Sequence, residues 1–355
     1  MNHGFWRGRR VFVTGHTGFM GGWLTLWLAE RGAQMAGYAL APPTRPSLFE
    51  AADIARSLCS VSGDVRDYGR LAATIQDFAP EIVIHLAAQS LVRAGQTAPL
   101  ETFSTNVIGT ANLLQALRGL RSLAAAVIVT TDKVYENHEI RRGFHEQDRL
   151  GGLEPYGGSK ACAEIVVDSF RHAYFSAAAR RPGVATVRAG NIIGGGDWAA
   201  DRLIPDAVRA FEAGKLLLLR HPDAVRPWQH VLDPVAGILA LAERLAGDPA
   251  RWEGAWNLGP HESDARTVAA VADELVRRWG DGAAWSRDPT GPIQPYEARL
   301  LALDCTKAAD VLGWHTRWSL DRAIAATVEW YKAYRAKDDV RGLALRQISA
   351  FEGVN

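Results

Sequence analysis

Three features of the 355-residue chain predict an α/β fold in which a doubly wound parallel sheet is followed by a smaller α/β lobe. Short apolar runs typical of buried strands recur through the first half of the chain and alternate with amphipathic stretches typical of helices. Three glycines separate the first run from the first helix. After residues 194–196, short apolar pieces, helices and proline-containing loops are mixed. The alternation indicates parallel strands in one sheet with helices on both of its faces.

The chain is accordingly divided into two parts. We expect residues 1–190 to form a Rossmann-like nucleotide-binding domain and residues 191–355 to form mainly a substrate-binding lobe, with some segments returning to the first domain. Five apolar runs are expected to be the strands of the first part, namely 10–14, 34–40, 81–87, 124–131 and 184–189. Its helices are expected at residues 23–30, 67–78 and 102–118. The second part offers strands at 216–219 and 255–258, and helices at 233–245, 267–279 and 320–334.

Composition limits the classes of function that the chain can have. Its 40 Lys and Arg nearly balance its 39 Asp and Glu, so no surplus of positive charge is available to neutralise a nucleic acid or an anionic membrane surface. No apolar run approaches the ~18 residues that span a bilayer, and the first ten residues do not form a signal peptide. We therefore expect a cytoplasmic protein without a nucleic-acid or membrane partner.

The cysteines and histidines give no sign of a metal site or of a disulfide framework. Cys59, Cys162 and Cys305 are odd in number and far apart, which fits a reducing compartment, and we expect buried thiols. No Cys-x-x-Cys occurs in the chain. The histidines considered as ligands also lack metal-like spacing: His16, His85, His221 and His230.

A glycine turn between the first strand and the first helix predicts a dinucleotide site. Gly15, Gly18 and Gly21 allow the backbone to turn tightly, to approach a pyrophosphate and to offer helix N-terminal N–H groups to its charge. The spacing is Gly-x-x-Gly-x-x-Gly rather than the Gly-x-Gly-x-x-Gly of the older fingerprint. The intervening residues belong to the same predicted site: His16, Thr17, Phe19 and Met20.

The second strand lacks the acid that commonly binds the adenosine ribose. No Asp or Glu occurs between Glu30 and Glu50, and Arg45 fits either a 2′-phosphate site or a solvated loop. The residues alone therefore leave NAD and NADP open. Asp64, followed by Val65, fits either a carboxylate that accepts the adenine amino group or a helix N-cap, and both interpretations stay open.

Two short patterns together predict a catalytic group. Tyr156 and Lys160 are four residues apart at the start of a helix, so both side chains lie on one face. A phenol with a pKa of about 10 is a poor base at neutral pH, and a neighbouring ammonium stabilises the phenolate. The sequence Thr131-Asp132-Lys133 follows the strand at 124–131, where ligands of a parallel sheet bind. It supplies a hydroxyl, an acid and a base beside the phenol.

These motifs resemble those of the extended short-chain dehydrogenase/reductase family of NAD-dependent epimerases and dehydratases. The resemblance is carried by the glycine turn at 15–21, by Tyr156-Gly-Gly-Ser-Lys160 and by the strand-end Thr131. Four further segments resemble the CDP-glucose 4,6-dehydratases within it: Thr131–Asn137, Asn191–Trp198, Arg226–Val231 and Trp256–Pro260. The similar motifs run from near residue 10 to about residue 315.

The resemblance implies a reaction and a division of roles. It implies tightly held NAD, a nucleotide-sugar substrate such as CDP-glucose, and a place in deoxysugar biosynthesis such as that of lipopolysaccharide O-antigens. Thr131, Tyr156 and Lys160 would form the core catalytic group. Asp132 and Lys133 would serve the elimination of water, and Lys133 stands where related dTDP-glucose and GDP-mannose dehydratases have Glu.

The resemblance also implies binding residues and a homo-oligomer, a homodimer or homotetramer. The cofactor would further contact a loop after the third predicted strand, at Leu86, Ala87 and Ala88. The substrate would be held by residues from both parts of the chain, namely Gln89, Asn191, Arg202, Leu203, Ile204, Arg226 and Arg299. Guanidinium groups match phosphate oxygens in a bidentate manner. Two departures from the family pattern are Met20, where lysine is usual, and Gly157-Gly158, where small serines are usual.

Two alternative functions remain open at this point. One is another nucleotide-sugar dehydratase or an epimerase of the same family. An epimerase returns hydride to C4 and needs no acid for the C6 hydroxyl, so Asp132-Lys133 argues against it. The other is a non-catalytic NAD-binding protein, which has no need of an activated phenol.

Overall fold

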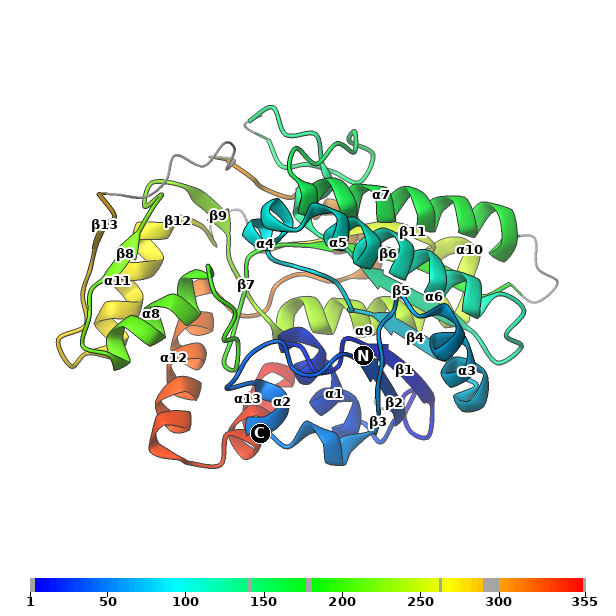
Figure 1. The fold of residues 1–355 in the computed structure, drawn as a ribbon, viewed down its shortest axis with the longest axis horizontal. Helices are drawn as coiled ribbons and strands as arrows, with labels where there is room; N and C mark the ends of the chain where they lie inside the picture. The colour runs from blue at the N-terminus through cyan, green and yellow to red at the C-terminus, as the bar shows by residue number, and fades with distance from the viewer. Residues whose placement is uncertain (1–3, 140–141, 177–180, 262–263, 290–299, 354–355) are drawn as a thin grey trace.

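The structure is a computed structural model that describes residues 4–139, 142–176, 181–261, 264–289 and 300–353. Figure 1 shows a large sheet with helices on both faces and a smaller lobe at one side. This architecture confirms the predicted α/β class with a doubly wound parallel sheet.

The central sheet has seven strands, all parallel, in the order β11-β6-β5-β4-β1-β2-β3. Five of them coincide with the predicted apolar runs: β1 (Arg10–Thr14), β2 (Gln34–Ala39), β4 (Ile82–His85), β5 (Ala125–Val129) and β6 (Gly183–Ala189). One edge strand is the short β3 (Cys59–Ser62). The other edge is β11 (Gly254–Leu258), which comes from the second half of the chain and pairs with β6.

Side chains alternate between the two faces of this sheet, as expected for strands buried on both sides. In β1, Val11 and Val13 belong to one hydrophobic cluster, whereas Phe12 belongs to another on the opposite face. The same alternation holds in β4, where Val83 lies opposite to Ile82 and Ile84. The sheet therefore separates two cores and leaves its strand ends as the place where loops from several strands meet.

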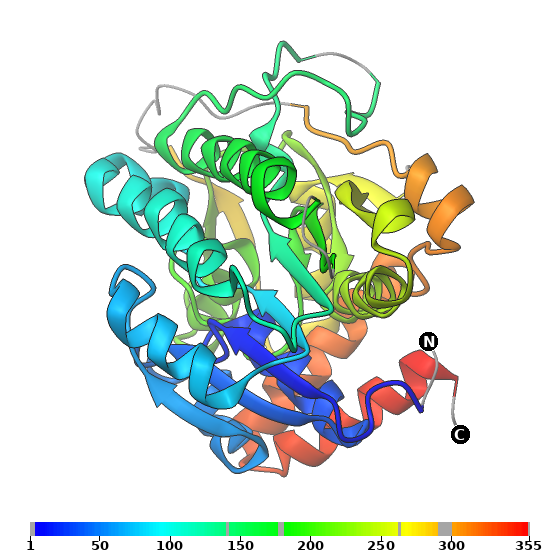
Figure 2. The same cartoon turned by 90° about the vertical axis from the view of Figure 1, so that its right-hand side faces the viewer.

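Helices cover both faces (Figures 1 and 2). One face is covered by α3 (Tyr68–Phe78), α6 (Gly109–Leu117) and α7 (Pro155–Phe170). The other is covered by α1 (Phe19–Glu30) and α9 (Leu232–Gly247), with α13 (Val340–Glu352) packed on α1. Shorter helices connect these elements: α2 (Leu48–Ala51), η1 (Ile54–Ser57), α4 (Val92–Thr97), α5 (Pro99–Phe103), η2 (Ser104–Ile108), η3 (Asp132–Val134), η4 (Arg171–Phe175) and α10 (Pro249–Trp252).

The smaller lobe at the left of Figure 1 is built from the second half of the chain. Its helices are α8 (Leu203–Glu212), α11 (Val268–Trp279) and α12 (Leu320–Ala336), whereas η6 (Ala308–Leu312) lies against the edge strand β11. Its strands form pairs: β8 (Leu217–Leu219) with β13 (Trp285–Arg287), and β9 (Val225–Pro227) with β12 (Ala265–Thr267). β7 (Ile192–Ile193) and β10 (Gln229–His230) pair between the lobe and the sheet. Segments after residue 190 thus contribute to both parts.

Two local expectations need correction. The first helix begins at Phe19 rather than at residue 23, and Gly21 and Gly22 therefore lie inside it. The expectation of buried thiols is wrong for Cys59, which is exposed because it lies on the edge strand β3. Cys162 and Cys305 are half-buried, and all three thiols are free. No helix in the described part of the chain is long and apolar enough to cross a membrane.

Candidate active site

The glycine turn packs so closely that side chains cannot be accommodated at two of its positions. Gly15 has a φ of +75°, and a Cβ there would lie 2.7 Å from the Ala87 backbone nitrogen. A Cβ at Gly21 would collide with the carbonyl oxygen of Gly15. The turn therefore brings the ends of β1 and β4 together directly in front of α1, and glycine is required for that approach.

The amino end of α1 is left open to an anion. Gly18 is its N-cap, no side chain of the described residues caps it, and its first turn contains no acidic residue. The positive end of the helix dipole and its N–H groups are therefore directed at the glycine turn, as in pyrophosphate sites. Phe19 and Met20, the first two helical residues, are half-buried here.

The side chains of His16 and Thr17 are used inside the protein. His16 Nε2 forms a 2.7 Å hydrogen bond with Ser60 Oγ, and Thr17 Oγ1 donates to the Leu40 carbonyl at 3.0 Å. Burial lowers the pKa of His16 to about 4, so the ring is neutral at neutral pH. The second ring nitrogen of His16, Nδ1, is buried and has no hydrogen-bond partner among the described residues.

On the adenosine side, the two readings of Asp64 are partly resolved. The N-cap of α3 is Asp67, which accepts from Arg70 N, so the interpretation of Asp64 as the cap is wrong. The Asp64 carboxylate instead accepts from Arg66 Nε at 2.9 and 3.0 Å, and this partner lowers its pKa. Val65 is buried.

Arg45 lies in solvent beyond β2. Its side chain is 88% exposed, and its nearest carboxylate is Glu50 at 3.8 Å. This favours the solvated loop arginine over a residue organised for a 2′-phosphate.

The loop after β4 is pinned to β1. Thr14 Oγ1 accepts from Leu86 N and Ala87 N at 3.2 Å each, and it contacts His85 Nδ1 at 2.7 Å. Ala88 follows in the same half-buried loop.

Gln89 is anchored at both ends of its amide by the protein. Its Nε2 donates to Thr102 Oγ1 at 2.9 Å, and its Oε1 accepts from Leu91 N at 2.6 Å. These bonds fix the side chain and leave one N–H and one lone pair of the amide for a ligand.

The ends of β5 and the start of α7 bring the predicted catalytic residues together. Glu154 caps α7 by accepting from Tyr156 N and Gly157 N at 2.7 and 2.6 Å. This fixes the first turn of α7, where the Tyr156 hydroxyl is hydrogen-bonded to the Thr131 side chain. One turn later, Lys160 Nζ donates to the Val129 carbonyl at 3.0 Å. Thr131, Tyr156 and Lys160 are therefore held as one buried group.

Burial dominates the ionisation of this group. It raises the pKa of Tyr156 to about 12, against the opposing effect of the neighbouring Thr131 side chain. Burial likewise lowers the pKa of Lys160 to about 8, against the attraction of the Glu164 carboxylate. Arg202 also favours the Tyr156 phenolate through its charge. The ammonium expected from the spacing to stabilise the phenolate does not overcome the burial of the phenol.

Asp132 and Lys133 form an adjoining acid–base pair. Asp132 is fully buried, and its Oδ1 accepts from Thr131 Oγ1 at 3.0 Å and from Lys133 Nζ at 3.2 Å. Its Oδ2 has no hydrogen-bond partner among the described residues and packs against the Gly190 backbone, where no Cβ could fit. Lys133 is about one-third exposed. The pair therefore joins a buried oxygen to an amine at the surface of the site.

Gly157 has a packing reason to be glycine. A Cβ there would lie 2.7 Å from the Lys133 carbonyl oxygen and 3.0 Å from Glu154 Oε1. The absence of a side chain lets the first turn of α7 rest directly on the Asp132–Lys133 segment.

Arg202 connects the smaller lobe to this group. Its NH1 donates to Asp197 Oδ2 at 2.9 Å and its NH2 to Ser90 Oγ at 3.1 Å. These contacts place a guanidinium between the loop after β4 and the first turn of α8, close enough to act on Tyr156. Of the two residues after Arg202, Ile204 is buried in the core and Leu203 is half-buried.

The remaining substrate residues are less clearly joined to the site. Asn191 has a φ of +47°, and its buried Oδ1 has no partner among the described residues. Arg226 is buried on β9 and donates to the Val225 carbonyl at 3.0 Å. Arg299 lies outside the described residues.

Two nearby residues were not predicted from the sequence. Glu154 was signalled by the Pro155 that follows it, since proline at the first helical position marks a helix start. Ser90 had no signal, because only the fold brings it to Arg202.

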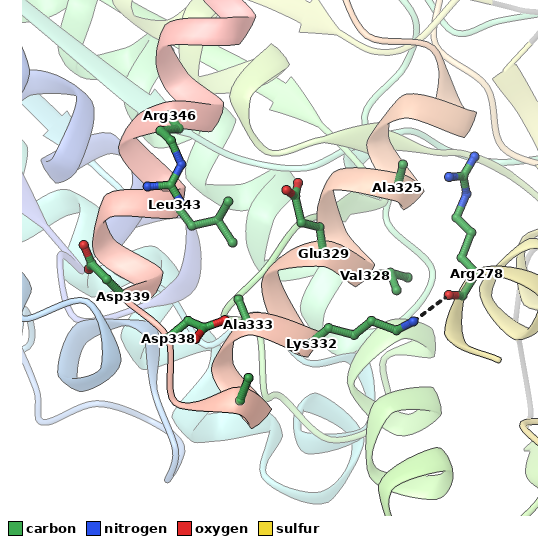
Figure 3. Close-up of a pocket in the computed structure, with 11 residues that line it drawn as sticks. Arg278, Ala325, Val328, Glu329, Lys332, Ala333, Asp338, Asp339, Leu343 and Arg346 are labelled. Atoms are coloured by element: carbon green, nitrogen blue, oxygen red, sulfur yellow. Dashed lines mark hydrogen bonds between the residues drawn. The ribbon is translucent and has the colours of Figure 1, made fainter. Parts of the chain in front are cut away.

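A separate hollow lies away from the candidate site residues. A cavity of about 720 Å³ is lined by residues of α12 and α13 and by Arg278 of α11 (Figure 3). Lys332 Nζ donates to the Arg278 carbonyl across one side of it. None of the candidate site residues lines it. Nor does any group of three or more His, Cys, Asp or Glu in the described chain have a geometry that could hold a metal ion.

Comparison with known proteins agrees with this arrangement. Residues 12–327 match the family described as GDP-mannose 4,6 dehydratase. The chain belongs to this family. Across 350 residues it is 47% identical to CDP-glucose 4,6-dehydratase of Salmonella typhimurium, covering 98% of this chain and 97% of that protein.

Solved structures of this dehydratase family and its relatives share the fold. The dTDP-glucose 4,6-dehydratase of Streptomyces venezuelae, solved with NAD bound, is 26% identical with a TM-score of 0.77, over 93% of this chain and 99% of that one. UDP-glucose 4-epimerase of Thermotoga maritima, solved with UDP-glucose, has a TM-score of 0.78 over 92% and 99% of the two chains. At 20% identity the epimerase supports the fold alone.

Proposed function

We propose that this protein is a CDP-glucose 4,6-dehydratase, a hydro-lyase that uses bound NAD to convert CDP-D-glucose to CDP-4-dehydro-6-deoxy-D-glucose. The observation that carries the proposal is the 47% identity to the Salmonella typhimurium enzyme over almost the whole of both chains. The group formed by Thr131, Asp132, Lys133, Tyr156 and Lys160 supports it, because it contains the groups that oxidation and elimination require.

The residues of the glycine turn fit NAD. The open amino end of α1 suits the pyrophosphate, and the close turn at Gly15 and Gly21 leaves the backbone bare of side chains. The solvated Arg45 favours NAD over NADP, as does the NAD bound in the solved dTDP-glucose 4,6-dehydratase of Streptomyces venezuelae. When bound, NAD supplies the hydride acceptor for C4 and the hydride donor for C6.

We assign oxidation at C4 to the buried group. Tyr156 would take the proton of the C4 hydroxyl, and Thr131 would hold the same oxygen, because its side chain already bonds to the phenol. Lys160 would stay charged below its pKa of about 8 and stabilise the phenolate as it forms.

We assign the elimination to the adjoining pair. A C4 ketone acidifies the C5 proton, and Lys133 is our candidate base because its amine lies at the surface of the site. Asp132 would protonate the departing C6 hydroxyl. Its Oδ1 contacts Lys133 Nζ at 3.2 Å, so the pair can exchange a proton after each turnover.

The substrate would be held by the smaller lobe. Arg202 and Arg226 are the candidate diphosphate ligands, and Asn191 offers an unused buried oxygen to a substrate donor. Leu203 and Ile204 would shape the pocket behind Arg202. Arg299 and Gln89 stay in the proposal on their motif positions.

We further propose a cytoplasmic homo-oligomer. Exposed apolar side chains occur on α5, η2 and α7: Leu100, Phe103, Ile108 and Ile165. Pairing of these helices with those of a second copy would remove that surface from water. Sedimentation of wild-type protein and of a Leu100→Glu/Ile165→Glu variant tests this, since the variant should sediment as the monomer.

A direct assay tests the activity. Purified protein is incubated with CDP-glucose, dTDP-glucose, UDP-glucose and GDP-mannose, and products are followed by mass spectrometry. We expect loss of one water from CDP-glucose, at a rate well above that for the other three. An isomer of unchanged mass would indicate an epimerase instead, and no product from any substrate would refute an enzymatic function.

A further inference from the structure

A buried ionic network lies behind the catalytic face of α7. Glu164 lies one turn beyond Lys160, and its carboxylate accepts three hydrogen bonds. The donors are Thr130 Oγ1 at 2.5 Å, Thr186 Oγ1 at 2.8 Å and Arg188 NH2 at 2.8 Å. The Glu164 and Arg188 side chains are only 4% and 5% exposed. One carboxylate therefore joins α7 to the end of β5 and to β6.

The other end of Arg188 extends the network away from the reacting group. Its NH1 donates to Tyr135 Oη at 2.9 Å and to the Glu146 carbonyl at 3.0 Å. Tyr135 Oη in turn donates to Asn257 Oδ1 at 2.7 Å. The Arg188 guanidinium therefore has hydrogen-bond partners on several elements. These partners hold its positive charge opposite the Glu164 carboxylate.

The position of Thr130 gives the network its relation to the chemistry. Thr130 lies between Val129, whose carbonyl accepts from Lys160, and Thr131, whose side chain bonds to Tyr156. A bond from Thr130 to Glu164 therefore fixes the strand end on both sides of that residue. The same carboxylate is on the helix face that carries Tyr156 and Lys160.

We propose that Glu164 is a positioning residue for the dehydratase reaction: it aligns the end of β5 with α7 and supplies the buried negative charge that keeps Lys160 an ammonium. The inference rests on the proposed function for its catalytic consequence. Its structural and ionic part concerns this chain alone and can be measured without substrate.

The charges around Lys160 determine the expected direction of the effect. Besides Glu164, Lys160 faces His85 from β4, whose pKa burial lowers to about 3, and Tyr156 lies one turn earlier on its own helix. Arg188 lies beyond Glu164, on β6. Neither His85 nor Tyr156 is charged at neutral pH, so Glu164 is the anion that opposes the burial of Lys160. Neutralising Glu164 should therefore lower the pKa of Lys160 below about 8.

The test compares three variants. Glu164→Gln keeps the size of the side chain and removes its charge. Glu164→Gln/Arg188→Met also removes the partner charge, so that no unpaired guanidinium is buried if the single variant fails to fold. Thr186→Val is the matched control, because it removes one bond to Glu164 and leaves the carboxylate.

Two readouts are taken from each folded variant. The chain has six lysines, so selective ¹³C labelling at Cε gives a spectrum in which Lys160 is assigned by its loss in Lys160→Arg. We expect the Lys160 titration midpoint to move down by about one pH unit in both Glu164 variants and to stay unchanged in Thr186→Val. The descending limb of the kcat–pH profile should move with it, and kcat at neutral pH should fall roughly 10- to 100-fold.

The outcomes separate this proposal from the proposed function. An unchanged Lys160 midpoint in folded Glu164 variants would overturn the ionic role, whatever the enzyme turns over. A shifted midpoint with unchanged kcat and unchanged profile would overturn the positioning role. Failure of wild-type protein to dehydrate CDP-glucose would refute the function while leaving the NMR titration interpretable.

Discussion

Burial outweighs charge pairing at the residues of the candidate site. Tyr156 and Lys160 both have pKa values shifted toward their neutral forms, because each loses water on folding. Beside them, the partly exposed Lys133 contacts the fully buried Asp132 carboxylate directly. At the scale of single residues, the site thus combines a buried group suited to oxidation with a pair suited to elimination, in which a buried carboxylate contacts a partly exposed amine.

Lys133→Ala should separate the two halves of the reaction. Without the amine, oxidation at C4 remains possible through Tyr156 and Thr131, but the C5 proton has no base. In D₂O we expect deuterium incorporation at C5 to disappear and single-turnover absorbance of reduced cofactor to persist. Lys215→Ala is the control, because this lysine is exposed after α8. Continued exchange at C5 in Lys133→Ala would eliminate Lys133 as the base.

Asp233 predicts a pH dependence of stability. It is buried at the start of α9, and burial raises its pKa to about 7, against hydrogen bonds from the N–H groups of Arg317 and Trp318. The folded state therefore binds a proton that the unfolded state has already released, so stability from this group is complete below pH 3.8 and is lost as pH rises through about 7.

Asp233→Asn should remove that dependence. The free energy of unfolding of wild type, measured relative to the variant by urea denaturation, should decline by up to about 4 kcal/mol between pH 4 and 8 and then level off. Using the difference cancels the opposite contribution of buried histidines such as His85 and His230. If the free energies of unfolding of the two proteins changed with pH in parallel, Asp233 would be ionised in the folded protein.

At the scale of elements, the glycine turn is the junction on which the nucleotide site depends. Gly21→Ala should force the turn to open, because the new methyl group meets the Gly15 carbonyl. We expect a loss of about 1–3 kcal/mol in stability and weaker NAD binding, measured by urea denaturation and calorimetry.

Gly247→Ala is the matched control for that variant. Gly247 ends α9, and a Cβ there meets no atom within 4 Å. Alanine should therefore leave NAD binding unchanged and alter stability by no more than about 1 kcal/mol, in the stabilising direction. Equal losses in the two variants would mean that the turn tolerates a side chain.

Elements with a local signal were predictable, and elements defined by distant contacts were not. The strand at 10–14 and the turn after it are encoded by adjacent residues, so both were found. The sequence predicts a later start for α1 than the structure has, because glycines such as Gly21 and Gly22 are poor helix formers. In the fold, Gly22 is needed where Leu48 packs, since a Cβ would lie 2.8 Å from its Cδ2.

The candidate site likewise contains residues that a local pattern predicts and contacts that no local pattern predicts. Tyr156 and Lys160 were found from their spacing, because one helix carries both. The links of Thr130 and Thr186 to Glu164 join three elements that are far apart in sequence. No periodicity encodes such links, and only the parallel pairing of β5 and β6 brings the two threonines together.

At the scale of the whole molecule, the end of the chain closes on its beginning. α13 packs on α1, where Trp27 Nε1 donates to Glu352 Oε1 at 2.6 Å and Arg31 pairs with the same carboxylate. Phe351 lies edge-on to Trp27, with ring centroids 5.6 Å apart. The helix that opens the nucleotide site is thus supported from behind by residues more than 300 positions later.

Phe351→Ala should therefore weaken the nucleotide-binding part although it lies at the opposite end of the sequence. Phe351 is 3% exposed and also contacts the Trp318 ring, so its loss leaves a cavity between α1 and α13. We expect a decrease of about 3–5 kcal/mol in the free energy of unfolding, followed by tryptophan fluorescence in urea. Tyr68→Ala, at a 43% exposed position on α3, should change it by no more than about 0.5 kcal/mol. Phe351→Ala could instead lose stability while the amide protons of α1 keep their protection from hydrogen exchange. In that case α13 would unfold as a separate unit, and its packing on α1 would not support the nucleotide site.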